Sequence, residues 1–153
     1  MHDFIRAAGA AALALSVSAG TAAAHSGASG VVKERMELMK DIAEQMKQIG
    51  AMIKGEAAFD AAAVRSAADT VAAHAGAMPE LFPEGSTDAP SEALPVIWQD
   101  WEAFRGLAAD LEDSAGALSE AAAAASGAGA IRAPFASVGR TCSACHEDFR
   151  QAD

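Results

Sequence analysis

Residues 135–150 read FASVGRTCSACHEDFR, and this stretch decides how the rest of the sequence is interpreted. Its apolar and sulfur-bearing side chains recur at intervals of three and four residues, which places them on one face of a helix. That face carries Phe135, Val138, Cys142, Cys145, His146 and Phe149. The stretch also holds the only two cysteines of the 153-residue chain. Any chemistry that needs a thiol must therefore take place on this helix.

The spacing Cys142-x-x-Cys145-His146 is the attachment signature of c-type haem. Two cysteines three residues apart on a helix can form thioethers to one side of a porphyrin. The imidazole of His146 then reaches the iron from the same surface. We therefore expect one haem c, bound covalently through both cysteines, with His146 as the proximal iron ligand.

Three other uses of this cysteine pair fit the sequence less well. A thioredoxin-like redox pair needs a βαβ setting, and no strand-like alternation is present. A zinc site needs further ligands at workable spacing, and beyond the motif and His25 only His74 is available. A structural disulfide would leave the adjacent His146 unexplained.

The N-terminal residues are typical of a secretory signal peptide. A short start with the basic Arg6 precedes an apolar run of small residues, and Ala22-Ala23-Ala24 fits a cleavage site. The run is too short and too rich in alanine for a stable membrane span. We predict a signal peptide at residues 1–24 and a haem-binding domain at residues 25–153, located in the periplasm.

Composition and periodicity indicate an all-α protein. Alanine is abundant, tyrosine is absent, and aromatic residues make up 5% of the chain. Apolar residues repeat at intervals of three and four over about 31–53, 60–77, 95–125 and 131–150. Gly55 is expected to end the first of these segments, and Asp60 to cap the second. In the last segment, Pro134 suits a first turn, so the regular helix could begin after residue 131. We expect an antiparallel up-down-up-down four-helix bundle with a long loop over residues 79–95.

The formal net charge of −10 constrains the partners. An acidic protein repels nucleic acid and anionic membrane surfaces. We therefore expect redox partner proteins with basic docking surfaces, although an acidic surface also serves solubility alone.

The chain resembles the class II c-type cytochromes, which include the cytochromes c′ and their low-spin relatives. The resemblance rests on Arg35-x-x-x-Met39, Lys54-Gly55-Glu56, Leu81-Phe82-Pro83-Glu84-Gly85-Ser86, Pro95-x-Ile97-Trp98, and Val138-Gly139-x-x-Cys142-x-x-Cys145-His146-x-x-Phe149-Arg150. It implies a four-helix bundle with haem at one end, and homodimers formed through the first two helices.

Met39 separates the two branches of that family. The expected topology brings the start of the first helix to the same end as His146. Met36 is expected off the seam formed by residues 39, 42 and 46, while Met46 and Met52 lie farther from that end. The resemblance implies that low-spin members carry an iron-ligating Met here, whereas cytochromes c′ carry an apolar residue and bind gases at a five-coordinate iron. We predict Met39 as the distal ligand, with simple core packing as its alternative.

Four further side chains are expected near the haem. Arg35 would offer its guanidinium to a propionate, with a solvated charge as the alternative. Phe82 and Trp98 would pack on the porphyrin or form ordinary core. Arg150 would shield the proximal face, or would complement the helix dipole. His74 is expected as a packed or hydrogen-bonded histidine, and only as a remote alternative ligand.

These expectations lead to a periplasmic electron carrier that is not an enzyme. The main alternative is a five-coordinate protein that binds NO or CO. A haem peroxidase would need a distal acid–base pair, and the sequence offers no polar group reliably placed for that role.

Overall fold

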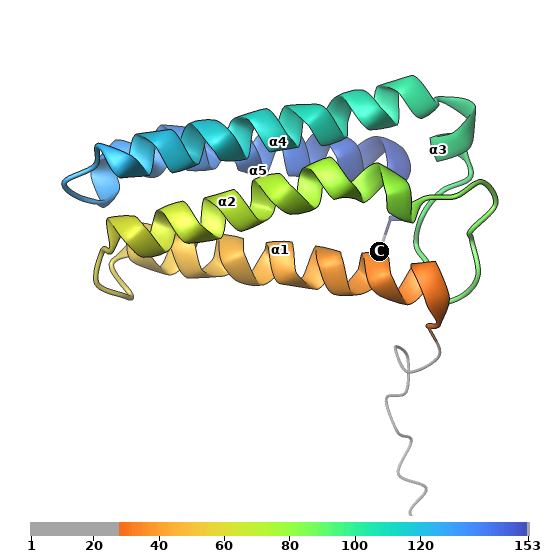
Figure 1. Ribbon diagram of the computed structural model, residues 1–153, viewed down its shortest axis with the longest axis horizontal. Helices are drawn as coiled ribbons and strands as arrows, with labels where there is room; N and C mark the ends of the chain where they lie inside the picture. Colours follow the sequence, from red (N-terminus) through yellow and green to blue (C-terminus); the bar gives the residue numbers. More distant parts are fainter. Residues whose placement is uncertain (1–27, 153) are drawn as a thin grey trace, which may run out of the picture.

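The computed structural model describes residues 28–152 as a bundle of four long helices (Figure 1). These are α1 (Gly30–Lys54), α2 (Ala61–Ala77), α4 (Trp101–Ala123) and α5 (Arg132–Phe149). Short helical turns are η1 (Met78–Leu81), α3 (Val96–Gln99) and η2 (Ala128–Ile131). The all-α bundle is thereby confirmed. The predicted signal peptide lies outside the described residues, and none of the described helices is both long and apolar enough to cross a membrane.

The predicted helix over 95–125 is wrong in one respect, because it is two helices with a break at Asp100. The φ of Asp100 is −123° and its ψ is 52°, outside the helical region. Its N–H donates to the Val96 carbonyl, and its own carbonyl accepts from the N–H of Phe104. Aspartate favours helix ends over helix interiors. Just after the break, Trp101 stacks on Phe104 within α4, with ring centroids 5.4 Å apart.

Two residues define the connection between α1 and α2. Gly55 ends α1 in the left-handed region at φ 79°, where a glycine has no steric penalty. Asp60 then begins α2, because its Oδ1 accepts from the N–H groups of Ala62 and Ala63 at 2.9 and 3.1 Å. Both signals were readable in the sequence, and both are confirmed.

The bundle interior is made largely of small and branched side chains. On α2 the buried face consists of Val64, Ala67, Ala68, Val71 and Ala75. Because these side chains are small, α4 packs closely along α2, and this is the most extensive helix pairing in the described part of the chain. The core thus needs few aromatic residues away from the end that carries α3.

The buried face of α1 coincides only in part with the predicted seam. Its buried residues are Val32, Arg35, Leu38, Ile42, Ile49 and Met52. Ile42 lies on the predicted seam and is buried, whereas the seam residues Met39 and Met46 are only partly buried. Among the long helices, α1 packs chiefly against α2. Its remaining side is therefore available to a cavity at the end of the bundle.

We predict that Asp60→Ala lowers the free energy of unfolding by about 1 kcal/mol, because two helix N–H groups lose their acceptor. Denaturant unfolding of the haem-loaded protein measures the change. Asp69→Ala is the matched control, because Asp69 is an exposed carboxylate farther along the same helix. Equal losses for both variants would show that the cap contributes nothing.

Candidate functional site

A cavity of about 340 Å³ opens at the end of the bundle that carries α3. It has the size of an ordinary cofactor pocket. Side chains from α1, α3, α4, α5 and the loop between η1 and α3 form its walls. The lining residues are Arg35, Met36, Met39, Lys40, Phe82, Pro90, Ser91, Glu92, Ala93, Ile97, Phe104, Cys145, His146, Phe149 and Arg150.

Of the eight predicted site residues, six line this cavity. They are Arg35, Met39, Phe82, Cys145, His146 and Arg150. Cys142 lies about one helical turn before Cys145 on α5 and is not among the lining residues. Trp98 also lies outside the lining. Its indole N–H donates to the Phe82 carbonyl at 2.9 Å, so it holds the backbone of a wall residue.

The α5 wall presents a donor set suited to haem attachment. Cys142 and Cys145 are half-buried and not joined by a disulfide. Burial raises the pKa of both thiols, and that of Cys145 reaches about 11, with Cys142 and Asp148 adding to the rise. Both side chains are therefore protonated thiols at neutral pH. Neither is blocked by a disulfide, and thioether formation requires two unblocked thiols.

His146 stands beside Cys145 on this wall. Desolvation lowers the pKa of its imidazole, and nearby Arg150 lowers it further. The imidazole is therefore neutral at pH 7 and keeps a lone pair for a metal. This protonation state suits an iron ligand.

The α1 wall presents two thioethers instead of one. Met36 and Met39 both line the cavity, and both are half-buried. Met36 was expected off the seam formed by residues 39, 42 and 46, yet it lines the same cavity as Met39. α1 therefore turns a broader face to the cavity than that seam. Either sulfur is a soft ligand of the kind that haem iron accepts.

Arg35 ties α1 to the pocket loop, which we define as residues 82–95. Its side chain is buried, with 4% exposure. The guanidinium donates to the Ser86 hydroxyl at 3.0 Å, to the Ser86 carbonyl at 2.5 Å, and to the Ser91 hydroxyl. It also lies 4.7 Å from the centroid of the Phe82 ring. The stem is packed as expected, while the head group is held by the loop.

The same loop is joined to the end of α5. The Leu94 N–H donates to the Phe149 carbonyl at 3.0 Å, and the Gln151 N–H donates to the Glu92 carbonyl at 2.8 Å. Arg150 Nε donates to a Glu92 carboxylate oxygen at 2.7 Å. The pocket loop therefore connects the α1 wall to the α5 wall across the cavity.

Aromatic rings close the inner end of the cavity. Phe104 contacts Phe82 at 4.8 Å and meets Phe149 edge to face at 5.5 Å between ring centroids. Such pairs stabilise a fixed arrangement of rings. Phe82 was predicted to lie at the site, and Phe149 was predicted only on the apolar face of its helix.

Sequence reasoning missed the contribution of residues 90–93. Pro90, Ser91, Glu92 and Ala93 line the cavity. They lie in a loop without periodicity, so hydrophobic patterning gives no signal there. The unusual length of the loop was the only indication of a role.

Together these features fit haem c. The cavity joins apolar aromatic and aliphatic walls to the Cys145 thiol, a neutral imidazole and a pair of thioethers, and the Cys142 thiol lies about one turn away on α5. A buried guanidinium at the rim suits a propionate carboxylate.

The comparisons with known proteins identify the family of this chain. Residues 30–150 match the family described as "Cytochrome C'". Cytochrome c-556 of Agrobacterium fabrum is 36% identical over 80% of this chain and 82% of its own length. The structure of cytochrome c′ from Rhodopseudomonas palustris is 33% identical, with a TM-score of 0.75 over 82% of this chain and 99% of that one.

A further similar structure is the nitric oxide complex of a leucine-to-alanine mutant of cytochrome c prime from Alcaligenes xylosoxidans. This structure is 28% identical, with a TM-score of 0.71 over 80% of this chain and 94% of that one. The chain belongs to the cytochrome c′ family, the class II c-type cytochromes with covalently bound haem c.

Proposed function

We propose that this protein is a periplasmic electron carrier in which His146 and Met39 are the axial ligands of the haem iron. The observation that carries the proposal is the placement of Met39 and His146 on the α1 and α5 walls of one cavity. Haem c supplies reversible one-electron transfer, and Met/His ligation favours that use. No other chemical step is required of the protein.

The surrounding residues have distinct tasks in this proposal. Cys142 and Cys145 hold the macrocycle, and His146 coordinates as a neutral imidazole. Phe82 and Phe104 keep the cavity apolar, which limits the access of water. Arg35 is placed to pair with a propionate while it anchors the pocket loop. A fixed pair of ligands in a rigid pocket limits the rearrangement that accompanies electron transfer.

Binding of NO or CO is the second candidate function. It is favoured by the similarity to a cytochrome c′ whose structure was solved as a nitric oxide complex. That structure is of a leucine-to-alanine mutant, so the Alcaligenes protein itself has a leucine at the mutated position. The two thioethers on the α1 wall of this chain favour a six-coordinate iron and electron transfer instead.

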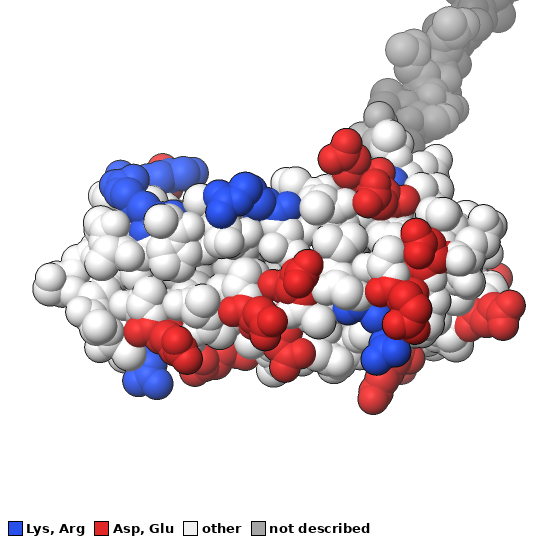
Figure 2. Space-filling view, turned by 90° about the horizontal axis from the view of Figure 1, so that it is seen from above, with Lys and Arg blue, Asp and Glu red and all other residues white. Residues whose placement is uncertain are grey.

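The surface around the cavity mouth favours positively charged redox partners. Figure 2 shows more acidic atoms toward the end that holds the cavity than toward the other end, and most basic atoms of that face toward the opposite end. Exposed carboxylates at the cavity end are Glu80, Glu84, Asp88, Glu92, Asp100, Glu102, Glu147 and Asp148. A basic docking surface on the partner would complement this end.

We predict that Met39→Leu converts a low-spin spectrum into a five-coordinate high-spin spectrum and abolishes the thioether–iron charge-transfer band. Absorption spectra of the haem-loaded protein in both redox states measure this. Met36→Leu is the matched control, because it removes the other thioether of the same wall and should leave the spectrum unchanged. A high-spin wild type, or a spectrum that depends on Met36 instead, would contradict the proposed ligation.

Electron transfer to a cationic oxidant should slow as salt rises, because the Debye length falls from about 30 Å at 0.01 M to about 8 Å at 0.15 M. Stopped-flow oxidation by tris(phenanthroline)cobalt(III) measures the rate, with ferricyanide as the oppositely charged comparison. Glu102→Gln should weaken the salt dependence, and Glu120→Gln at the far end of α4 should leave it unchanged. A rate that does not change with salt concentration would contradict electrostatic steering of the oxidant by the acidic end.

We expect the exported protein to begin at His25 and to contain one haem. The intact mass of the protein from a periplasmic fraction should equal residues 25–153 plus one haem. A cytoplasmic protein that retains residues 1–24 would contradict the predicted signal peptide.

A further inference from the structure

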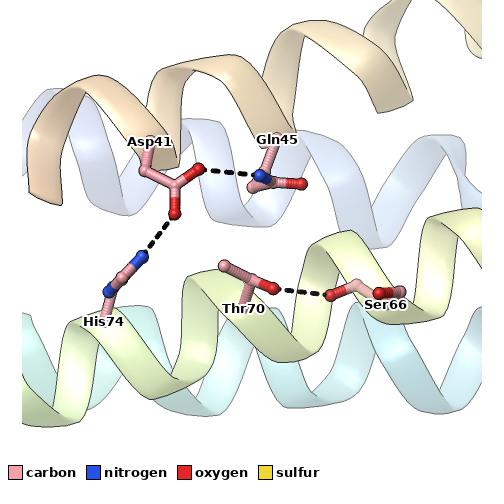
Figure 3. Close-up of polar contacts among 5 residues, drawn as sticks. All are labelled: Asp41, Gln45, Ser66, Thr70 and His74. Atoms are coloured by element: carbon pink, nitrogen blue, oxygen red, sulfur yellow. Dashed lines mark hydrogen bonds and ion pairs between the residues drawn. The ribbon is translucent and has the colours of Figure 1, made fainter.

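A polar contact between α1 and α2 lies outside the haem cavity. His74 Nε2 on α2 lies 2.7 Å from Asp41 Oδ2 on α1, and Gln45 Nε2 donates to Asp41 Oδ1 at 2.8 Å (Figure 3). An aspartate carboxylate is charged at neutral pH and only accepts hydrogen bonds, so Nε2 of His74 carries the proton. We call these three residues the helix clasp.

Within the clasp, the contact between His74 and Asp41 is the one side-chain hydrogen bond that joins α1 to α2 among residues 28–152. Its position is informative because α1 packs chiefly against α2. The apolar side chains between these helices resist their separation. A hydrogen bond is directional, so the contact with His74 constrains the rotation of α1 on its α2 side, as the bonds of Arg35 do on its loop side.

Asp41 and Met39 belong to the same turn of α1. At 3.6 residues per turn, side chains two positions apart point to nearly opposite sides of a helix. Asp41 accordingly points toward α2 in Figure 3, whereas Met39 lines the haem cavity. Any rotation of α1 that breaks the clasp also moves the Met39 sulfur.

We propose that the helix clasp positions Met39 for the iron, with His74 and Asp41 acting as positioning residues that do not touch the haem. This inference rests on the proposed ligation by Met39. In this proposal His74 positions Met39 and is not itself an iron ligand. Its contact with Asp41 is the hydrogen-bonded kind expected for this residue.

The clasp would control how easily a diatomic ligand replaces Met39. Carbon monoxide can reach the sixth site only when Met39 leaves it. The apparent affinity therefore scales with the population in which Met39 is detached. The clasp favours the attached arrangement, so its loss enlarges the detached population. A charge-assisted hydrogen bond between partly exposed groups predicts an increase in CO affinity of about three- to tenfold.

The test is CO titration of the ferrous, haem-loaded protein, together with the thioether–iron charge-transfer band of the ferric form. His74→Leu removes the clasp from α2, at a distance from Met39 along the chain. Asp41→Ala removes it from α1, and Asp41→Asn keeps an acceptor and should restore much of the wild-type affinity. The double variant His74→Leu/Asp41→Ala should add little beyond either single change, because both act through one contact.

Thr70→Val is the matched control. Thr70 lies one turn before His74 on α2, and its hydroxyl donates to the Ser66 carbonyl of its own helix at 2.9 Å (Figure 3). It should leave CO affinity unchanged. Far-UV circular dichroism and haem content establish that each variant folds and is loaded.

The outcomes separate the two proposals. A low-spin wild type whose CO affinity rises on loss of the clasp, with a weakened charge-transfer band, supports the inference. A low-spin wild type whose folded His74→Leu variant binds CO unchanged overturns the clasp alone. An equal rise in Thr70→Val also overturns it, because the effect would then come from α2 stability in general. A high-spin wild type overturns the Met39 ligation and the clasp together.

Discussion

One buried charge organises the haem end of this bundle. The guanidinium of Arg35 is removed from water, and an unpaired charge in that position would cost several kcal/mol. The pocket loop meets this demand with the hydroxyl and carbonyl of Ser86 and the hydroxyl of Ser91. Because the loop is held there, its next residues reach the end of α5 and pair with it. The buried guanidinium on α1 needs hydrogen-bond acceptors, and supplying them fixes the conformation of the loop. The loop in turn shapes the haem cavity.

Prediction from sequence succeeded where short-range chemistry dominates. The haem motif, the Asp60 cap and the Gly55 helix end each depend on a few neighbouring residues, and all lie where expected. The break at Asp100 was missed, because the apolar period continues through it from Ile97 to Trp101 and Phe104. The loop contacts of Arg35 were missed as well, because they join residues more than fifty positions apart.

The two walls of the cavity are held by different neighbours. α5 pairs with α4 and with the pocket loop, and it carries both cysteines. α1 lies mainly against α2, and Arg35 ties it to the same loop. The wall that carries Met36 and Met39 is therefore connected to the attachment wall through the pocket loop.

The separation of charge along the bundle has a consequence for encounters with other proteins. Carboxylates crowd the end that holds the cavity, while Lys54, Arg65, Arg132 and Arg140 lie toward the other end (Figures 1 and 2). The molecule therefore has an electric dipole along its long axis, with the negative pole at the haem. In the field of a positively charged surface, such a dipole experiences a torque that turns the haem end forward before contact. Rotational search is then shortened, and fewer collisions present the wrong end.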